Sequence, residues 1–308
     1  MLPAFLATVL FSLSVLFAGR TTRMLGATTA NFYRLCVSAI LLALWTHNYG
    51  REFGFRASRL FLLSGCLGFG LGDFALYHAI PRLGPRLTAL MVHCLAAPFA
   101  AVTEWLWMET PLSLLQIAFG VVTLLGVTIA LSRSEHRRLS RRALAIGLVF
   151  GVVAAIGQGG GAVLSRKAST MAEAAGYNVA GFAAGLTAAY QRILGGLALA
   201  AVPTLWVTIE KRRMSGKYPV EDPGAAGGCR RAWPWVILNS LAGPTIGVAC
   251  YQWALANAPS GVVLPIVATT PITLIPFAYL LEGDKPGPRS LIGGVIAVGG
   301  AISLSLAG

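Results

Sequence analysis

Two stretches of this sequence match each other in register: PFAAVTEWLWMETPLSLLQIAFG at residues 98–120 and PITLIPFAYLLEGDKPGPRSLIG at residues 271–293. Each begins at a proline in an apolar run, reaches a glutamate 11 residues later, and ends on a glycine 22 residues after the proline. Beyond the end of each stretch, another glycine lies 28 residues after the proline: Gly126 in the first half and Gly299 in the second. Spacing kept over such a length in both halves of the chain indicates an internal duplication.

The composition of the whole chain is that of a membrane protein. Hydrophobic residues make up 56% of the 308 residues and charged residues only 11%, with a mean hydropathy of +0.71. An ordinary soluble domain is about 25% charged. Too little polar surface is therefore available for a water-facing globule, which excludes a soluble enzyme, a disordered chain and a secreted disulfide scaffold.

Ten runs are apolar and long enough to cross a hydrocarbon core of roughly 30 Å as helices. Beyond the outermost two residues of each run, the charged residues inside them are Arg34, Asp73, Glu104 and Arg192. The predicted fold is therefore an all-α membrane protein with ten transmembrane helices. The runs cover residues 3–19, 29–46, 60–80, 87–108, 112–132, 143–165, 186–207, 233–255, 260–281 and 288–306.

Five runs fall in each half, which divides the chain into a first unit at 1–133 and a second at 142–308. An odd number of spans per unit places the two units in opposite orientations in the membrane. This is the inverted repeat found in many secondary transporters. Corresponding residues of the two units include Arg34 and Arg192, and, after a one-residue gap, Tyr77 and Tyr251.

The repeated prolines predict distorted helices, because each removes a backbone donor. We expect kinks at Pro98 and Pro271. The run 260–281 contains three prolines, so it should be the most distorted span, with a break just before Pro271 that faces the central cavity. The repeated acids Glu109 and Glu282 are expected to end their helices at the water interface rather than bind substrate.

This doubled pattern resembles the EamA-type branch of the drug/metabolite transporter superfamily. The shared features are two fused five-helix units, each closing with a proline-containing helix, a glutamate and a glycine-containing last helix. The resemblance implies a secondary transporter of the bacterial inner membrane that exports small metabolites, amino acids or drugs through a central cavity. Its partners would be a small-molecule substrate and the lipid bilayer. A lipid-carrier flippase or a non-transporting membrane subunit is the alternative, and a membrane-embedded lipid enzyme is the weakest one.

Ionisable residues inside membrane spans are candidates for function, because burying a charge in a bilayer is costly. At 1.5 Å per helical residue, Arg34, Asp73 and His93 lie about 8, 10 and 9 Å from the same membrane face. Tyr77 is one turn from Asp73 on the same side of its helix. Three consecutive helices are thus predicted to bring ionisable groups into one layer.

Two interpretations of this layer remain open. Arg34 and Asp73 could form an ion pair that joins their helices, or Asp73 could exchange a proton, relayed by His93, or meet a cationic group of the substrate. In a third possibility Arg34 extends to the interface unpaired. His93 alone is also typical of a hydrogen-bonded core histidine.

The second half is predicted to differ from the first. Arg192 matches Arg34, but the position that corresponds to Asp73 is near Gly247. Tyr251 and Gln252 fall in the same layer as Arg192. They are expected to hydrogen-bond either the arginine or a substrate.

The sequence predicts no metal, cofactor or nucleic-acid partner. It contains no HExxH, CxxC or GxxxxGK[ST] motif, so ATP should not drive the protein directly, and protons are the candidate coupling ion. Its net charge of +13 comes from short loops. Loops after odd-numbered runs carry most of the basic residues, so the positive-inside rule places them in the cytoplasm and both termini outside. The family resemblance implies the opposite orientation. Oligomeric state is not predicted.

Overall fold

The computed structural model describes residues 2–50, 53–108, 113–130, 140–217, 225–258, 260–283 and 285–307. Over these residues the chain is helical apart from short connections and contains no strand, as the all-α prediction requires. The helices of the first half are α1 (Leu2–Leu25), α2 (Ala27–Tyr49), α3 (Phe55–Gly65), η1 (Cys66–Asp73), α4 (Phe74–Leu83), α5 (Pro85–Met108) and α6 (Leu114–Ala130). Those of the second half are α7 (Arg141–Ala174), α8 (Phe182–Lys217), α9 (Ala225–Ser240), η2 (Leu241–Thr245), α10 (Ile246–Asn257), α11 (Ser260–Ala268), α12 (Thr270–Glu282) and α13 (Pro288–Leu306).

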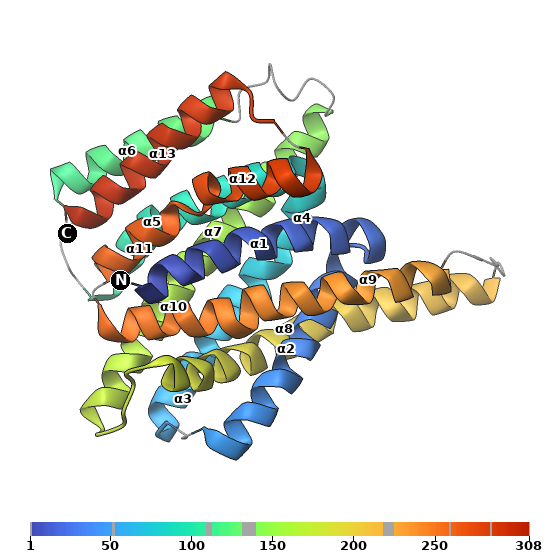
Figure 1. Ribbon diagram of the computed structural model, residues 1–308, viewed down its shortest axis with the longest axis horizontal. Helices are drawn as coiled ribbons and strands as arrows, with labels where there is room; N and C mark the ends of the chain where they lie inside the picture. Colours follow the sequence, from blue (N-terminus) through green and yellow to red (C-terminus); the bar gives the residue numbers. More distant parts are fainter. Residues whose placement is uncertain are drawn as a thin grey trace.

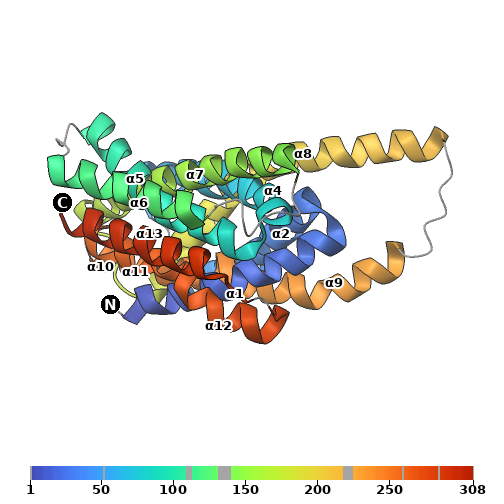
Figure 2. The same cartoon turned by 90° about the horizontal axis from the view of Figure 1, so that it is seen from above.

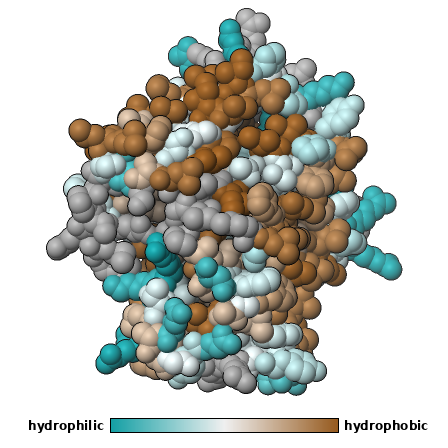
Figure 3. All heavy atoms as spheres, turned by 60° about the vertical axis from the view of Figure 1, so that its left-hand side comes forward, coloured by the Kyte–Doolittle hydropathy of each residue, from teal (hydrophilic) through white to brown (hydrophobic). Residues whose placement is uncertain are grey.

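The outer surface of the bundle is suited to lipid. Among the described residues, six helices are long and apolar enough to cross a membrane, and three shorter helices are also apolar. Large apolar side chains point outward, with Leu114 86% exposed and Leu280 76% exposed. Figure 3 shows such residues gathered over much of one face, with hydrophilic residues toward its margins. The chain is therefore an integral, multi-pass membrane protein.

The last helices of the two halves pack directly against each other, side by side in Figure 1. Glycines allow this contact, because a Cβ placed on Gly126 of α6 would lie 2.3 Å from the backbone nitrogen of Ala297 in α13. Gly293 makes an equally close approach to Ala130. The other two repeated glycines, Gly120 and Gly299, have open space around them. Of the four repeated glycines, only Gly126 and Gly293 therefore make close contacts in this interface.

Three helices extend well beyond the apolar runs that predict them. α7 continues to Ala174, α8 continues to Lys217, and α9 begins at Ala225. Most of the long connection at 208–232, which the runs predict to be a loop, is therefore helical; residues 218–224 lie outside the described chain. Lysine, arginine and glutamate lower the hydropathy but are good helix formers, so the helix continues where the apolar run stops. The extension of α8 and the start of α9 project beyond the other helices (Figures 1 and 2).

The run 260–281 is interrupted, as its prolines predict. α11 ends at Ala268 and α12 begins at Thr270, with Pro271 in its first turn. The hydroxyl of Thr269 donates to the carbonyl oxygen of Ile266 (2.6 Å), and Thr8 of α1 donates to the same oxygen (3.2 Å). The expectation that the break faces the central cavity is wrong, because none of residues 268–271 lines that cavity. The carbonyl oxygen of Val267, which Pro271 leaves without a backbone donor, accepts from the hydroxyl of Thr270 (2.6 Å). Pro98 lies inside α5, which continues through it.

Two further distortions were not expected from the sequence. The third helix of the first half and the third helix of the second half each contain a π-helical segment, η1 and η2. A π turn holds an extra residue and is often found at functional sites. Both segments lie on the cavity described next, and η1 ends on Asp73.

Candidate substrate cavity

A cavity with about 550 Å³ of empty space, part of it open to solvent, lies between the two halves of the chain. α1, α2, η1, α4 and α5 line it from the first half, and α7, α8, η2 and α10 from the second. Its lining is mainly apolar and contains three charged side chains that are almost fully buried. The lining residues are Phe11, Ser14, Val15, Ala18, Arg34, Phe69, Asp73, Leu76, His93, Gln158, Arg192, Gly243, Pro244, Val248 and Tyr251.

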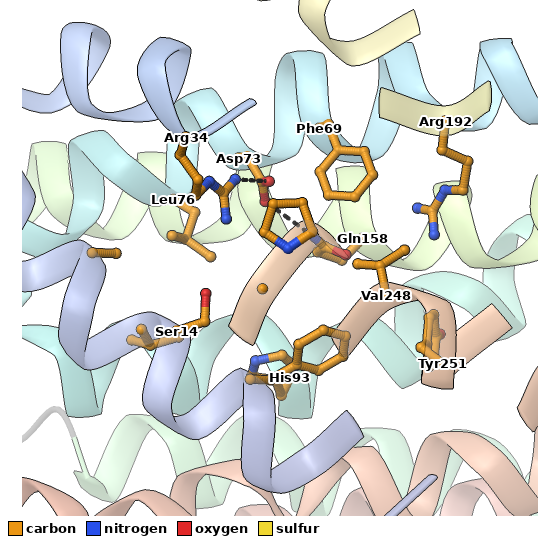
Figure 4. A pocket seen from close by; sticks show the side chains of 15 residues that line it. Ser14, Arg34, Phe69, Asp73, Leu76, His93, Gln158, Arg192, Val248 and Tyr251 are labelled. Atoms are coloured by element: carbon orange, nitrogen blue, oxygen red, sulfur yellow. Dashed lines mark hydrogen bonds and ion pairs between the residues drawn. The ribbon is translucent and has the colours of Figure 1, made fainter. Parts of the chain in front are cut away.

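Arg34 and Asp73 form a buried ion pair, as one of the two interpretations predicts. Their exposed fractions are 5% and 4%, and Nη2 of Arg34 donates to Oδ2 of Asp73 (Figure 4). Gln158 of α7 donates to the other carboxylate oxygen, Oδ1, over 3.0 Å. Arg34 also donates to the side-chain oxygen of Asn31 (3.1 Å). Each carboxylate oxygen of Asp73 therefore accepts a hydrogen bond from a side chain.

Close backbone contact places Gln158 next to the acid. A Cβ on Gly157 would lie 2.6 Å from the Cα atom of Gly72 in η1, so α7 and η1 cross with glycine on both sides. Such contacts between small residues are a common means of helix association in membranes. This crossing places the side-chain amide of Gln158, in the second half, beside the carboxylate of Asp73, in the first half.

Tyr77 connects the ion pair to two more helices. The guanidinium carbon of Arg34 lies 4.8 Å from the centre of its ring, a cation–π distance. The hydroxyl of Tyr77 accepts a hydrogen bond from Asn239 of α9 (2.6 Å), whose side-chain oxygen accepts one from Ser14 of α1 (2.7 Å). The first arginine thus belongs to a hydrogen-bonded network that crosses between the halves.

Arg192 has a different environment. It is 2% exposed, and within the described parts of the chain it has neither an ion pair nor a hydrogen bond; its Nε atom is buried without a partner. The ring of Phe69 faces its guanidinium at 5.1 Å. Figure 4 shows the two arginines entering the cavity from separate helices, with Arg34 beside Asp73 and Arg192 beyond Phe69.

The remaining predicted residues divide between the cavity and its surroundings. His93 lines the cavity and stacks on Phe11 with ring centres 5.9 Å apart, but no hydrogen bond joins it to Asp73 among the described residues. Tyr251 lines the cavity and meets the edge of Phe11. Gln252 is 1% exposed and does not belong to the lining, and neither polar atom of its side chain has a partner among the described residues, so it bonds neither Arg192 nor the cavity contents. Side chains on a helix change direction by about 100° per residue, so Gln252 points away from the cavity that Tyr251 lines.

Neutral polar residues were missed from the sequence. Gln158, Asn239 and Ser14 lie in apolar runs, where an amide or hydroxyl also needs a partner. A search confined to ionisable groups passes over them. Their position in otherwise apolar runs is a usable signal, although it does not say which helices they join.

The model of the family described as "EamA-like transporter family" matches residues 1–132 and 145–306. The chain belongs to the EamA-like transporter family. This EamA family protein is accordingly a membrane transporter of the drug/metabolite type. A solved structure described as "Crystal structure of protein" matches 98% of this chain and 96% of its own, with a TM-score of 0.55 and 15% sequence identity. At that identity the likeness shows the fold alone. A comparison with curated proteins gives no match.

Proposed function

We propose that this protein is a secondary transporter with ten membrane spans in two inverted five-helix units, 1–133 and 142–308. A small metabolite, amino acid or drug would bind in the cavity between the units, and alternating access would export it. The observation that carries the proposal is one cavity, lined by both units, that holds three buried charges within an apolar bundle. Buried charges of this kind mark substrate and ion pathways in membrane proteins.

The distorted helices support the same proposal. η1 and η2 interrupt the third helix of each unit, and α11 and α12 are separated by a break. Discontinuous helices in corresponding positions of two repeats are typical of transporters with binding sites at the repeat interface. The family model also matches two successive segments that nearly coincide with the two units.

Contacts at one end of the cavity are those expected of a closed gate. Arg23 at the end of α1 forms an ion pair with Glu282 at the end of α12 (2.6 Å). Arg20 donates to the carbonyl oxygen of Leu281 (2.6 Å) and lies 4.1 Å from the ring centre of Trp235. These contacts join the first unit to the second and would break when that end opens. Glu282 thus ends its helix, as its spacing predicts, whereas Glu109 lies outside the described residues.

Counterflow in proteoliposomes tests this function. Vesicles loaded with an unlabelled solute should accumulate the same labelled solute against its gradient, because a carrier exchanges one for the other. A panel of amino acids, organic acids and amines is to be tested with and without a proton gradient, which also tests proton coupling through Asp73. Empty liposomes and the Asp73→Asn variant are the negative controls.

A different outcome would favour an alternative class. Translocation of a fluorescent lipid with no solute exchange would indicate a flippase. The absence of both activities in correctly folded protein would indicate a non-transporting subunit. Vesicles sorted by orientation would give the direction of transport.

A further inference from the structure

The charges in the cavity do not balance. Arg34 and Asp73 neutralise each other, and Gln158 occupies the second oxygen of the acid. Arg192 adds a positive charge on the same cavity, with no acidic partner among the residues described. The described side chains of the cavity therefore carry one uncompensated positive charge. A lone buried charge is unfavourable, because its lost hydration is not replaced.

The second half has no room for an acid at the position that corresponds to Asp73. The position that corresponds to Asp73 is near Gly247, and a Cβ there would lie 2.2 Å from the carbonyl oxygen of Ala242. A side chain at this position would therefore collide with the backbone of η2. Around Arg192, glycines take the place of larger residues: a Cβ on Gly68 would lie 2.9 Å from its Nη2 atom. The fold keeps the guanidinium accessible to the cavity and without a protein anion.

We propose that Arg192 binds the anionic group of the substrate, and that the substrate is an organic monoanion with an apolar body. This inference rests on the proposed function for the identity of the cavity as the substrate site. The carboxylate of the ligand pairs with Arg192 as the carboxylate of Asp73 pairs with Arg34. One negative charge makes the cavity neutral, and a planar carboxylate fits the paired donors of a guanidinium.

The remaining lining determines what surrounds the anion. Phe11, Phe69, Val248 and Tyr251 present rings and an aliphatic side chain to the same space, so the rest of the ligand is apolar, and a flat ring suits it. A cationic group finds no unpaired acid among the described lining residues, since Asp73 already pairs with Arg34 and also accepts from Gln158. An acid is therefore favoured over an amine or a zwitterion with the same body.

Thermal unfolding of the purified protein in detergent tests this without any need for transport. The probes are phenylacetate with phenylacetamide and indole-3-acetate with indole-3-acetamide, at equal ionic strength. At least one of the two acids should raise the Tm of the wild type in a saturable way, and its amide should not. Arg192→Gln should weaken the apparent affinity for that acid at least roughly tenfold, since it removes charge-assisted hydrogen bonds. Arg213→Gln, which removes an exposed arginine from the same helix, should bind the acid as the wild type does.

A second measurement keeps the test valid if a variant is damaged. Without ligand, Arg192→Gln should have a Tm at least as high as the wild type, because the substitution removes an unpaired buried charge. The proposal is overturned if neither acid shifts the Tm, if an amide acts like its acid, or if Arg192→Gln responds like the wild type. If an acid binds through Arg192 but no solute shows counterflow, the proposed transport function fails and this inference stands. If neutral or cationic solutes exchange equally well in wild type and Arg192→Gln, the inference fails and the transport function stands.

Discussion

Arg34 and Arg192 occupy corresponding places in the two units, yet only the first is neutralised. Arg34 has a carboxylate, an amide and an aromatic ring around its guanidinium. Arg192 has the ring of Phe69 and the cavity. In the proposed division between the two sites, one arginine holds helices together and the other binds a ligand.

The largest effect should follow from loss of the acid. Asp73→Asn leaves Arg34 as a second unpaired buried cation, and breaking such a pair costs roughly 3–5 kcal/mol. We expect a marked fall in stability and loss of transport, measured by unfolding in detergent and by counterflow. The double variant Asp73→Asn with Arg34→Gln should regain stability but not transport.

Two results would contradict this account of the pair. Normal transport by Asp73→Asn with an unchanged gradient dependence would make the pair purely structural. A double variant no more stable than the single one would mean that the two residues do not stabilise each other.

The second-largest effect should come from disrupting the backbone contact between Gly65 and Arg192. A Cβ on Gly65 would lie 1.7 Å from the carbonyl oxygen of Arg192, so Gly65→Ala must move α3 away from α8. Overpacking of this kind costs about 1–3 kcal/mol, and we expect the upper end. Gly299→Ala in α13, which has open space, should instead stabilise by about 0.5–1 kcal/mol. Equal effects of the two substitutions on unfolding would refute the contact.

The two corresponding tyrosines should respond differently to loss of the hydroxyl. Tyr77→Phe removes the acceptor of the Asn239 amide and leaves the ring beside Arg34, at a cost of about 1–3 kcal/mol. The hydroxyl of Tyr251 makes no hydrogen bond within the described chain, so Tyr251→Phe should change stability by less than about 0.5 kcal/mol. Unfolding free energies of both variants give the comparison directly, and a reversed order would show that the Asn239 network is not stabilising.

The smallest effect concerns the contact between Phe69 and Arg192. Phe69→Leu also alters packing, so we expect the contact to be visible only in a double-mutant cycle with Arg192→Gln. A coupling of about 0.5–2 kcal/mol is expected for a desolvated cation–π pair. Additive effects on the unfolding free energy would mean that the ring does not stabilise the charge.

The sequence predicts the first half of the site better than the second. Depth along each helix is enough to bring Arg34 and Asp73 together, because hydropathy fixes where the spans begin. It does not give rotation about the helix axis, so it does not distinguish Tyr251, which lines the cavity, from its neighbour Gln252, which does not. Orientation in the membrane and proton coupling stay predictions; three of the loop arginines, at 133, 137 and 138, lie outside the described residues.

Other features depend on contacts between distant segments. Gln158 reaches Asp73 only because Gly157 and Gly72 let two helices touch, and no local pattern states that they cross there. The π segments also have no simple sequence signal, since a glycine-rich run can form an ordinary helix. The break before Pro271 was predictable because proline lacks a donor at a known place.

The π segment η1 fixes the direction of Asp73 by counting residues. Each residue of an α-helix turns the chain by about 100°, whereas a π turn accommodates one additional residue. If residues 66–73 formed an ordinary α-helix instead, that extra residue would rotate Asp73 and everything after it by about 100° relative to α3. The carboxylate would then point away from Arg34 while α4 kept its helical form. The pairing of acid and arginine thus depends on the local helix type as well as on the identity of two side chains. A substitution that turned η1 into an α-helix of the same length would separate the pair without altering either member.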